Sequence, residues 1–375
     1  MNSSIKKKIN EFLKKFTQLD ELYDNYPQLK PYFNGEVNRF PTIEKKHLLR
    51  HLSKIVLQRE FFLPLKCNIE VISTCQLDCD FCYVGEGKLK PFRAKNRMTY
   101  DDFLKIWDDI ELFTTEVEFT GGEPTLNKEV YQMMQKAKET GVYTTLTTNA
   151  QLINEKLSKK ILEANPSRVL IALDGIDNNM YESTRKRGDY NVLLNNISEL
   201  VKAKSKYPNN TTNIQLQTII HKKTVDHISS FKKIAKEIGA NSISTKPLFI
   251  WPDSTDEEIQ FLKENYLIKD KNQYSYYKLD ENGDFIINWR TPGFCSNTQN
   301  VHIGSGSEVI PCWYLLRDTF DTDRIIDSNF YDIWFSDKYK NYRYIMENEE
   351  ISAACKKCIG RYEPDIYTFT IIKEV

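Results

Sequence analysis

The chain has 375 residues, of which 40% are hydrophobic and 28% charged, and its 52 Lys and Arg residues balance its 52 Asp and Glu residues. A net charge of zero gives no basic footprint, so we expect no nucleic-acid partner. No apolar run has the length that crosses a bilayer, which excludes an ordinary membrane-spanning helix. The positive N-terminus leads into an amphipathic segment, not a secretion signal, so we expect a cytoplasmic protein.

Residues 1–60 are predicted to form a helical N-terminal extension. Apolar residues recur there at steps of three and four, as on one face of a helix. These residues are Ile5, Ile9, Phe12, Leu13 and Phe16. A further helix is predicted at 42–57. We favour a brace packed on the next domain, because we find no strands of a winged-helix module here; recognition of a substrate or leader peptide is the alternative.

Residues 61–250 are predicted to form an α/β domain. Strand-like runs lie at 65–73, 116–120, 142–148, 168–173, 214–220 and 242–246. Helical stretches lie between them, at 99–112, 127–140, 152–164, 189–204 and 225–238. This alternation predicts parallel strands with crossover helices. Six such units make a partial (β/α)6 TIM barrel, a fold whose active site lies at the C-terminal ends of its strands.

Three closely spaced cysteines, Cys75, Cys79 and Cys82, follow the first predicted strand. A cubane iron–sulfur cluster has four irons that each take a thiolate, so three thiolates leave one iron open to another ligand. A partial zinc site is the alternative. Zinc would need a fourth ligand, usually histidine, and none of the five histidines lies within twenty residues of these cysteines.

The motif GGEP at residues 121–124 follows the second predicted strand. Alone, it would be a Gly-Pro turn with a solvated glutamate. Together with the three cysteines, in this order and at this separation, it resembles the radical S-adenosylmethionine (radical SAM) superfamily. The resemblance implies a catalytic [4Fe-4S] cluster on Cys75, Cys79 and Cys82, with S-adenosylmethionine (SAM) on the open iron.

The resemblance also implies residues that bind SAM. They are Phe81, Tyr83, Gly121, Gly122, Glu123, Thr148, Asn149, Asp174, Arg185 and Gln217. The two glycines would let the backbone approach the ligand, and Glu123 would accept hydrogen bonds from the methionine ammonium. Arg185 would pair with the SAM carboxylate. Arg187 is an alternative for that role, and a surface charge at a helix end is the alternative for Arg185.

Residues 291–375 hold four more cysteines, which are Cys295, Cys312, Cys355 and Cys358. Four thiolates complete either a cubane or a zinc tetrahedron. Their order, with a Pro-Cys turn at Cys312 and a final CxxC, resembles the twitch domain, a shortened SPASM domain. The resemblance implies a small α+β domain with one fully ligated auxiliary [4Fe-4S] cluster. The turn carries one residue more than the usual pattern, and no cysteine follows Cys358.

The remaining segment, 251–290, is predicted to be a linker or insert with a hairpin. The Asn-Gly pair at 282–283 lies between two apolar runs, which is typical of a hairpin turn. The eighth cysteine, Cys67, alternates with polar residues in the first strand, so we assign it to the core. In chain order the predicted parts are therefore 1–60, 61–250, 251–290 and 291–375.

The resemblance implies that one electron from a flavodoxin- or ferredoxin-type reductant cleaves SAM to methionine and a 5′-deoxyadenosyl radical, which removes hydrogen from the substrate. A fully ligated auxiliary cluster would then accept an electron, which favours oxidative modification. The preferred substrate is a ribosomally synthesised peptide. A small-molecule dehydrogenase or decarboxylase, acting on a sugar, aminocyclitol or tetrapyrrole, is the alternative. A non-catalytic electron carrier or scaffold is a third hypothesis, against which the intact Glu123 and loop cysteines argue.

Overall fold

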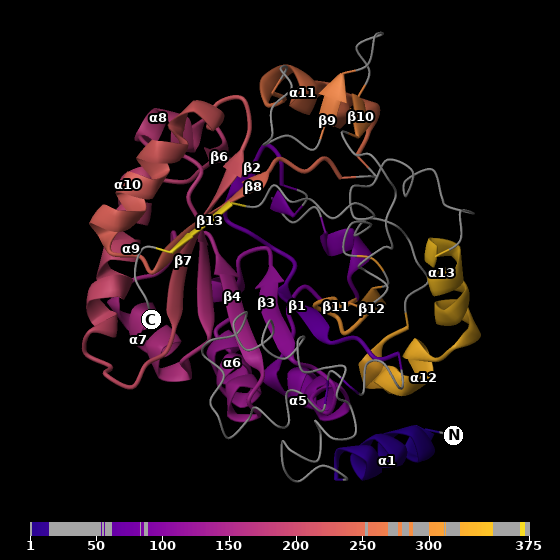
Figure 1. Cartoon of the computed structure of the whole chain (residues 1–375). Coiled ribbons are helices and arrows are strands. Elements are labelled where there is room, and N and C mark those ends of the chain that lie inside the picture. Colours follow the sequence, from indigo (N-terminus) through magenta and orange to yellow (C-terminus); the bar gives the residue numbers. More distant parts are fainter. Residues whose placement is uncertain are drawn as a thin grey trace.

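A curved sheet with helices along its outer side forms the body of the molecule (Figure 1). The computed structural model describes residues 2–14, 54, 56, 62–82, 84–85, 89–251, 254–268, 277–279, 285–287, 300–310, 312, 323–347 and 368–371. The sequence positions of Tyr83, Cys295, Cys355 and Cys358 lie outside these residues, and so does most of the predicted helix at 42–57.

The main sheet has nine strands in the order β12-β11-β1-β3-β4-β5-β7-β8-β13. Its six barrel strands are β1 (Lys66–Ile72), β3 (Glu116–Gly121), β4 (Tyr143–Thr148), β5 (Arg168–Ala172), β7 (Asn213–Ile220) and β8 (Ser242–Pro247). Neighbouring barrel strands pair in parallel throughout. The six predicted strands and the partial-barrel fold are thereby confirmed.

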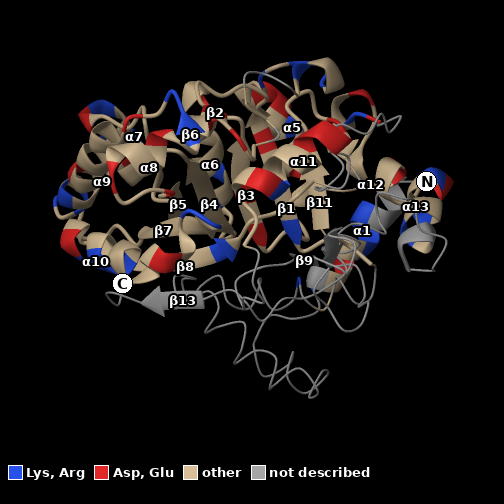
Figure 2. Ribbon diagram, turned by 90° about the horizontal axis from the view of Figure 1, so that it is seen from above, with Lys and Arg blue, Asp and Glu red and all other residues tan. Residues whose placement is uncertain are grey.

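Five long helices alternate with these strands, as the sequence predicted. They are α5 (Tyr100–Ile110), α6 (Val130–Glu139), α7 (Glu155–Ala164), α9 (Tyr190–Lys204) and α10 (Ile228–Ile238). Side-chain caps start several of them; Thr99, for example, forms a reciprocal capping box with Asp102 at the start of α5. Both signs of charge occur along α7, α9 and α10 (Figure 2).

The two faces of the curved sheet differ in chemistry because side chains alternate along each strand. Residues on the helix side, such as Ile69, Phe119 and Leu216, are fully buried and form the core. The opposite face is polar. Arg168 on β5 lies 3.9 Å from Glu116 on β3, although β4 separates these strands, so this face is concave. We call the space that it encloses the lumen.

The N-terminal helix α1 (Asn2–Leu13) packs beside α5 and α12 (Phe330–Trp334). Its Ile9 is fully buried, and its Lys6 Nζ lies 2.6 Å from Asp108 Oδ2 on α5. In this described part of the extension, the contacts are those of a brace on the barrel, the interpretation that we favoured.

The C-terminal segment contributes three strands to the barrel sheet, which the sequence did not predict. They are β11 (Asn300–Ile303), β12 (Val309–Ile310) and β13 (Thr368–Ile371). β11 extends the parallel sheet beside β1, and β12 and β13 close its two edges in antiparallel pairing. The segment assigned to a separate small domain therefore shares a sheet with the barrel. Helix α13 (Asp337–Glu347) follows α12.

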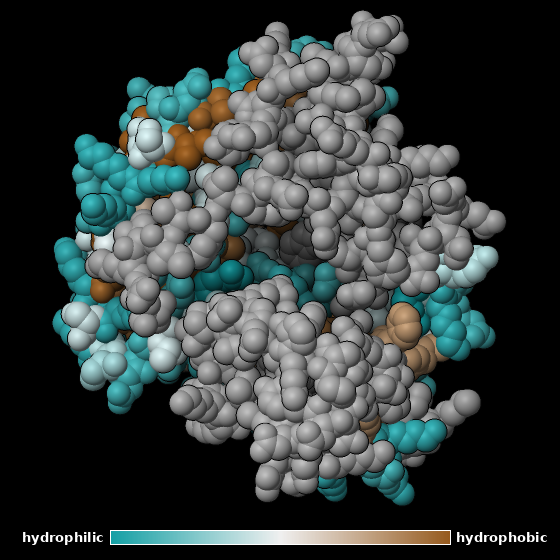
Figure 3. All heavy atoms as spheres, viewed as in Figure 1, coloured by the Kyte–Doolittle hydropathy of each residue, from teal (hydrophilic) through white to brown (hydrophobic). Residues whose placement is uncertain are grey.

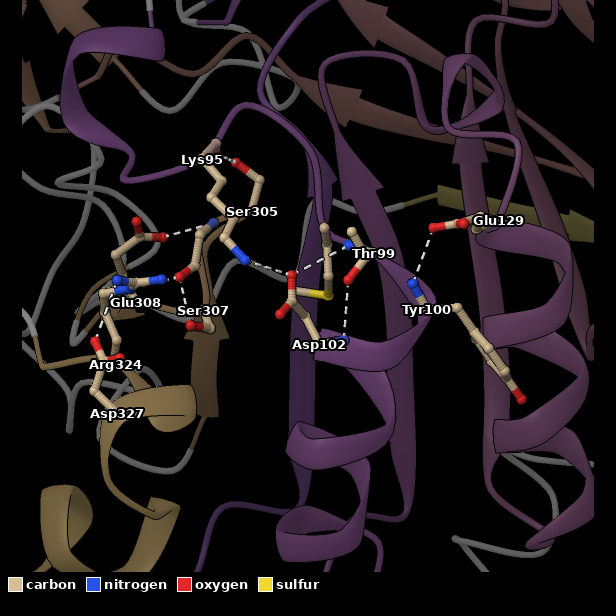
Figure 4. A network of polar contacts seen from close by, with 12 residues as sticks. Lys95, Thr99, Tyr100, Asp102, Glu129, Ser305, Ser307, Glu308, Arg324 and Asp327 are labelled. Carbon is tan, nitrogen blue, oxygen red and sulfur yellow. Dashed lines mark hydrogen bonds and ion pairs between the residues drawn. The ribbon is translucent and has the colours of Figure 1, made fainter.

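The turn between β11 and β12 is fixed to the loop that precedes α5 (Figure 4). Glu308 Oε1 accepts a hydrogen bond from the Ala94 amide at 2.5 Å, and Ser305 Oγ donates to the Lys95 carbonyl at 2.6 Å. Lys95 in turn pairs with Asp102 at 2.9 Å. These contacts join the C-terminal segment to the loop that follows the predicted cluster cysteines.

Smaller elements surround the C-terminal ends of the strands. They are β2 (Asp78–Cys79), β6 (Arg185–Lys186), α8 (Asn178–Glu182), α11 (Asp256–Asn265), β9 (Tyr277–Leu279), β10 (Phe285–Ile287) and the 3₁₀ turns at Lys90–Phe92, Pro124–Leu126, Val225–His227 and Ile325–Asp327. Strands β9 and β10 pair antiparallel, as expected for a hairpin across the Asn-Gly pair. We predicted neither β2 nor β6 nor α8, because a two-residue strand has no periodicity to detect.

Candidate functional site

The three cysteines of the first motif lie on a loop after β1, at the C-terminal end of the barrel. This loop is not free-standing. Cys79 pairs with Arg185 in the short β2–β6 ladder, and the Asp80 amide donates to the Thr184 carbonyl at 3.2 Å. Within the loop, the Cys82 amide donates to the Cys79 carbonyl at 3.0 Å. A segment more than one hundred residues away in the sequence thus holds the cysteine loop in place.

The thiols of this loop fit an iron–sulfur cluster. Backbone amides of Leu77 and Val84 each point at a sulfur, of Cys75 and Cys82 respectively, at 3.4 Å. Such hydrogen bonds to sulfur stabilise thiolates and tune the cluster that they bind. Burial raises the pKa of Cys75 and of Cys79 to about 12, so the free thiols keep their protons until a metal displaces them.

A single bound ion is the alternative to a cluster at these cysteines. Among the residues that the structure describes, no three Cys, His, Asp or Glu side chains are arranged to hold one metal ion. A zinc ion needs all its ligands around one centre, whereas a cubane takes one thiolate at each iron corner and spreads its ligands. The loop with Cys75, Cys79 and Cys82 supplies three of the four thiolates that a cubane takes.

Glu123 lies at the centre of the polar contacts beside this loop. Its side chain is buried, and Oε1 accepts hydrogen bonds from the Thr125 amide at 3.1 Å and from the hydroxyls of Thr125 and Thr148, both at 2.6 Å. Oε2 accepts from the Asn149 amide at 2.8 Å. Burial raises the pKa of Glu123 above its usual value, although these hydrogen bonds oppose the shift. Each carboxylate oxygen has two lone pairs, and Oε2 accepts one hydrogen bond from the protein where Oε1 accepts three.

The two glycines of the motif allow the backbone that leads into the cysteine loop to pack directly against them. A Cβ on Gly122 would lie 1.8 Å from the Thr74 carbonyl oxygen, and one on Gly121 would lie 2.2 Å from that of Ile72. Gly121 also has φ +132°, which only glycine adopts readily. The sequence interpretation gave this space to the ligand. In the structure the backbone after β1 occupies it, accepting hydrogen bonds from the Gly122 and Glu123 amides.

Asn149 connects Glu123 to the cysteines. Its Nδ2 lies 3.5 Å from Cys75 Sγ, and its Oδ1 accepts from Gln76 Nε2 at 3.0 Å. Thr148 is buried beside it and donates to Glu123, as described above. The ends of β1, β3 and β4 thus bring together three of the predicted groups: the cysteine loop, Glu123 and the Thr148–Asn149 pair.

Asp174 and Arg185 pair with each other, which the sequence did not predict. Arg185 Nε donates to Asp174 Oδ2 at 2.6 Å and a second guanidinium nitrogen contacts the same carboxylate, while Asp174 Oδ1 accepts from the Ile219 amide at 2.6 Å. Arg185 NH1 also lies 3.7 Å from Cys79 Sγ. Because only 12% of the Arg185 side chain is exposed, the alternative of a surface charge is wrong. Desolvation would lower the pKa of Arg185, but Asp174 keeps it raised.

Phe81 lies among aromatic and cationic neighbours. Its ring meets Tyr266 edge-on, with centroids 5.8 Å apart, and the Arg185 guanidinium lies 5.9 Å from its centroid. The Tyr266 hydroxyl donates to Asp80 in the cysteine loop at 2.5 Å. Sequence reasoning missed Tyr266, because nothing in its local sequence indicates a contact with a loop 186 residues earlier.

Gln217 lies on the lumen side of β7, half-buried, and its Nε2 donates to Ser244 Oγ at 3.3 Å. It is therefore placed one layer below Asp174 rather than beside the cysteines.

The described part of the second cysteine group is Cys312, which is buried just after β12. Cys295, Cys355 and Cys358 lie outside the described residues. Cys67 is fully buried on the helix side of β1, with its sulfur 3.1 Å from Thr114 Oγ1. Its assignment to the core is confirmed.

Family comparisons agree with this chemistry. The model described as the radical SAM superfamily matches residues 69–231, and the iron–sulfur cluster-binding domain SPASM matches residues 295–359. The chain therefore contains a radical SAM domain, followed by a SPASM domain. Its radical SAM domain uses a [4Fe-4S] cluster and SAM, and its SPASM domain carries auxiliary iron–sulfur chemistry.

The chain is similar to several curated proteins. A tungsten-containing aldehyde ferredoxin oxidoreductase cofactor-modifying protein of Pyrococcus furiosus is 22% identical over 81% of this chain and 90% of its own length. The GTP 3′,8-cyclase of Clostridium botulinum is 26% identical over 70% of this chain and 85% of its own. PqqA peptide cyclase of Bradyrhizobium diazoefficiens is 28% identical over 31% of this chain and 30% of its own.

Solved structures share the fold. SuiB of Streptococcus suis has a TM-score of 0.58 and 14% identity, covering 90% of this chain and 83% of that one. The structure of native anSMEcpe with bound AdoMet has a TM-score of 0.52 and 18% identity, covering 80% of this chain and 88% of that one. At these identities the likeness establishes the architecture alone.

Proposed function

We propose that this radical SAM protein is an enzyme that oxidatively modifies a ribosomally synthesised peptide, with a cluster on Cys75, Cys79 and Cys82 and SAM on the open iron. The observation that carries the proposal is the joint placement of the cysteine loop, Glu123 and Asn149 at the ends of three neighbouring strands. The described residues contain no helix long and apolar enough to cross a bilayer.

When bound, the cluster and SAM supply a carbon-centred radical, formed with one electron from an external flavodoxin- or ferredoxin-type reductant. The protein supplies position and a dry environment. Thr125, Thr148 and Asn149 fix the oxygens of Glu123, which would accept a hydrogen bond from the SAM ammonium. Phe81 and Tyr83 would flank the adenine, as the resemblance implies.

Asp174 holds the Arg185 guanidinium beside Cys79. In that position one cation lies beside the cysteine sulfur, and the same cation would pair with the SAM carboxylate. The pair therefore offsets negative charge on the thiolates and on SAM at once. Gly121 and Gly122 set the height of the cysteine loop over the strands, and Gln217 lies deeper, on the substrate side.

We assign Cys295, Cys312, Cys355 and Cys358 to one auxiliary [4Fe-4S] cluster. Four thiolates leave none of its irons open. When bound, this cluster would supply an acceptor for the electron that the substrate radical loses, while a proton would leave to solvent or to a base. This balance makes a net two-electron oxidation of the substrate.

Two candidate substrates need separate tests. The peptide is supported by the named activity of PqqA peptide cyclase and by the solved structure of SuiB bound to its precursor peptide SuiA. A small molecule is the second candidate, because the GTP 3′,8-cyclases align over 70% of this chain.

The deciding experiment is anaerobic turnover of the cluster-loaded, dithionite-reduced protein. SAM is added with the peptide encoded by a short neighbouring gene, or with metabolites of the neighbouring pathway, and products are read by mass spectrometry. We expect 5′-deoxyadenosine from the wild type and none from Cys75→Ala. A peptide lighter by two hydrogens supports the proposal. Modification of a metabolite alone would replace the peptide with the small molecule, and absence of 5′-deoxyadenosine would refute enzymatic SAM cleavage.

A further inference from the structure

The lumen of the barrel is charged, and one of its charged side chains forms no salt bridge with a described residue. The space-filling view has a hollow near the centre of this face, with hydrophilic residues in its wall (Figure 3). On the lumen side of the strands lie Lys66, Glu116, Glu118, Arg168 and Lys246. Such residues on the inner face of a barrel are unusual, because small barrels are ordinarily filled by apolar side chains.

Four of these five residues are paired near the N-terminal ends of the strands. Lys66 Nζ lies 3.2 Å from Glu116 and 3.7 Å from Glu118, and Arg168 lies 3.9 Å from Glu116. Thr147 donates a further hydrogen bond to Glu118 at 2.6 Å. These contacts make a polar floor in which both carboxylates already have partners.

Lys246 is the exception. It lies near the C-terminal end of β8, half-buried, on the same face as Ser242 and Ser244. No carboxylate in the described part of the chain forms a salt bridge with its ammonium. Its charge still acts on Glu118 across the lumen. Burial raises the pKa of Glu118, but the cations Lys66, Arg168 and Lys246 and the hydrogen bond from Thr147 lower this pKa below its usual value.

The charge balance of these five residues favours a ligand with one negative charge. Three cations, Lys66, Arg168 and Lys246, face two carboxylates, Glu116 and Glu118, which leaves one net positive charge. A third carboxylate on this face, Glu70 of β1, is neutralised by Arg93 at 2.9 Å and does not change the sum. One carboxylate group would balance this net charge. A phosphate carries up to two charges at neutral pH and is usually held by several cationic groups, whereas here the other two cations are committed to the floor.

We propose that Lys246 binds a carboxylate of the substrate, so that the peptide segment entering the lumen carries an acidic side chain or a free C-terminus. This inference rests on the proposed function, since it names the substrate chemistry of the same site. The carboxylate would dock on the wall formed by β8, beneath the ends of the strands that carry the cysteine loop, Glu123 and Asn149.

Binding of small probes tests this inference on the full-length, cluster-loaded, SAM-bound protein by calorimetry. The N-acetyl, N-methylamide derivative of aspartate offers only a side-chain carboxylate, and N-acetylglycine offers only a terminal one. The corresponding asparagine derivative is the neutral control, and inorganic phosphate tests the other anion. We expect at least one carboxylate probe to bind at least tenfold more weakly to Lys246→Gln, and the asparagine derivative to bind both proteins equally weakly.

Lys232→Gln is the matched control, because Lys232 is an exposed lysine on the outer helix α10. It should bind the carboxylate probes as the wild type does. Which of the two carboxylate probes depends on Lys246 identifies the source of the charge. Unchanged carboxylate binding in Lys246→Gln, or no carboxylate binding to the wild type, would overturn the inference.

Two further measurements distinguish this inference from other roles of Lys246 and from failure of the proposed function. Weaker SAM binding by Lys246→Gln would show that the Lys246 ammonium binds the SAM carboxylate. If Lys246→Gln weakens the binding of phosphate but of neither carboxylate probe, the substrate is phosphorylated. Either result contradicts the inference. SAM cleavage is measured on the same preparations. If the wild-type protein cleaves SAM but binds no carboxylate, this inference alone is refuted. If it cleaves no SAM, the proposed function is refuted.

Discussion

Replacing Gly122 with alanine tests what the glycine pair of the GGEP motif does. The new Cβ would lie 1.8 Å from the Thr74 carbonyl oxygen and 2.1 Å from its carbon, whereas Cβ contacts shorter than 3.0 Å are essentially absent from proteins. The two backbones must separate by at least the difference, about 1.2 Å. Both are ordinary main chain, so no flexible side chain can relieve the overlap.

The magnitude follows from what this separation breaks. Two hydrogen bonds cross the contact, from the Gly122 amide to the Ile72 carbonyl at 2.8 Å and from the Glu123 amide to the Thr74 carbonyl at 2.9 Å. Each contributes about 0.5–1.5 kcal/mol, and overpacking a tight site costs about 1–3 kcal/mol. Gly122→Ala should therefore lower the free energy of unfolding by about 2–6 kcal/mol.

The assay is urea unfolding of chelator-treated, reduced protein, which holds neither cluster nor SAM. We expect the loss of stability in this metal-free state, together with low iron uptake on reconstitution. Gly85→Ala is the control, because its nearest contact is the flexible Asp78 side chain at 3.1 Å. If the metal-free variant unfolds like the wild type and loses only SAM affinity, the glycine serves the ligand and our reasoning is refuted.

Three other substitutions have outcomes fixed by the structure. Arg93→Met leaves the buried Glu70 carboxylate without the guanidinium that contacts it twice at 2.9 Å, which should cost about 3–5 kcal/mol at pH 7. Burial raises the pKa of Glu70, but His302 and Arg93 lower it to about 2. Because this folded pKa lies below the ordinary value of 4.5, ionised Glu70 stabilises the folded protein fully above pH 4.5, and this contribution is lost as pH falls toward 2. Urea unfolding should thus give a gap from the wild type that narrows in acid, and a gap constant with pH would contradict this. Arg185→Gln should destabilise the metal-free protein by about 3–5 kcal/mol, because it leaves Asp174 unpaired. It should also lower the reduction potential of the cluster, measured in an EPR titration, because a cation beside Cys79 is lost. An unchanged potential would place the guanidinium away from Cys79. Cys79→Ser should reduce the iron content from about eight to about four atoms per chain and abolish SAM cleavage, whereas loss of a single metal atom would indicate a mononuclear site.

Local patterns were sufficient to predict the barrel. In β1, for example, apolar residues alternate with polar ones, and in α5 they recur at helical spacing, so the burial that stabilises these two elements is encoded within ten or so neighbouring residues. The cysteine spacing and the GGEP motif are equally local. They indicated the cluster chemistry because three thiolates on a short loop are chemically incomplete in a recognisable way.

The sequence by itself therefore determined the fold class, the superfamily and the position of the chemistry at the strand ends. The tertiary structure decided the partners of the charged groups. It pairs Asp174 with Arg185, sets Gly122 against Thr74, and leaves Lys246 outside the salt bridges of the described part of the lumen, with only a longer-range attraction to Glu118. Coulombic and steric contacts depend on distances between segments far apart in the chain, and a one-dimensional pattern carries no such distances.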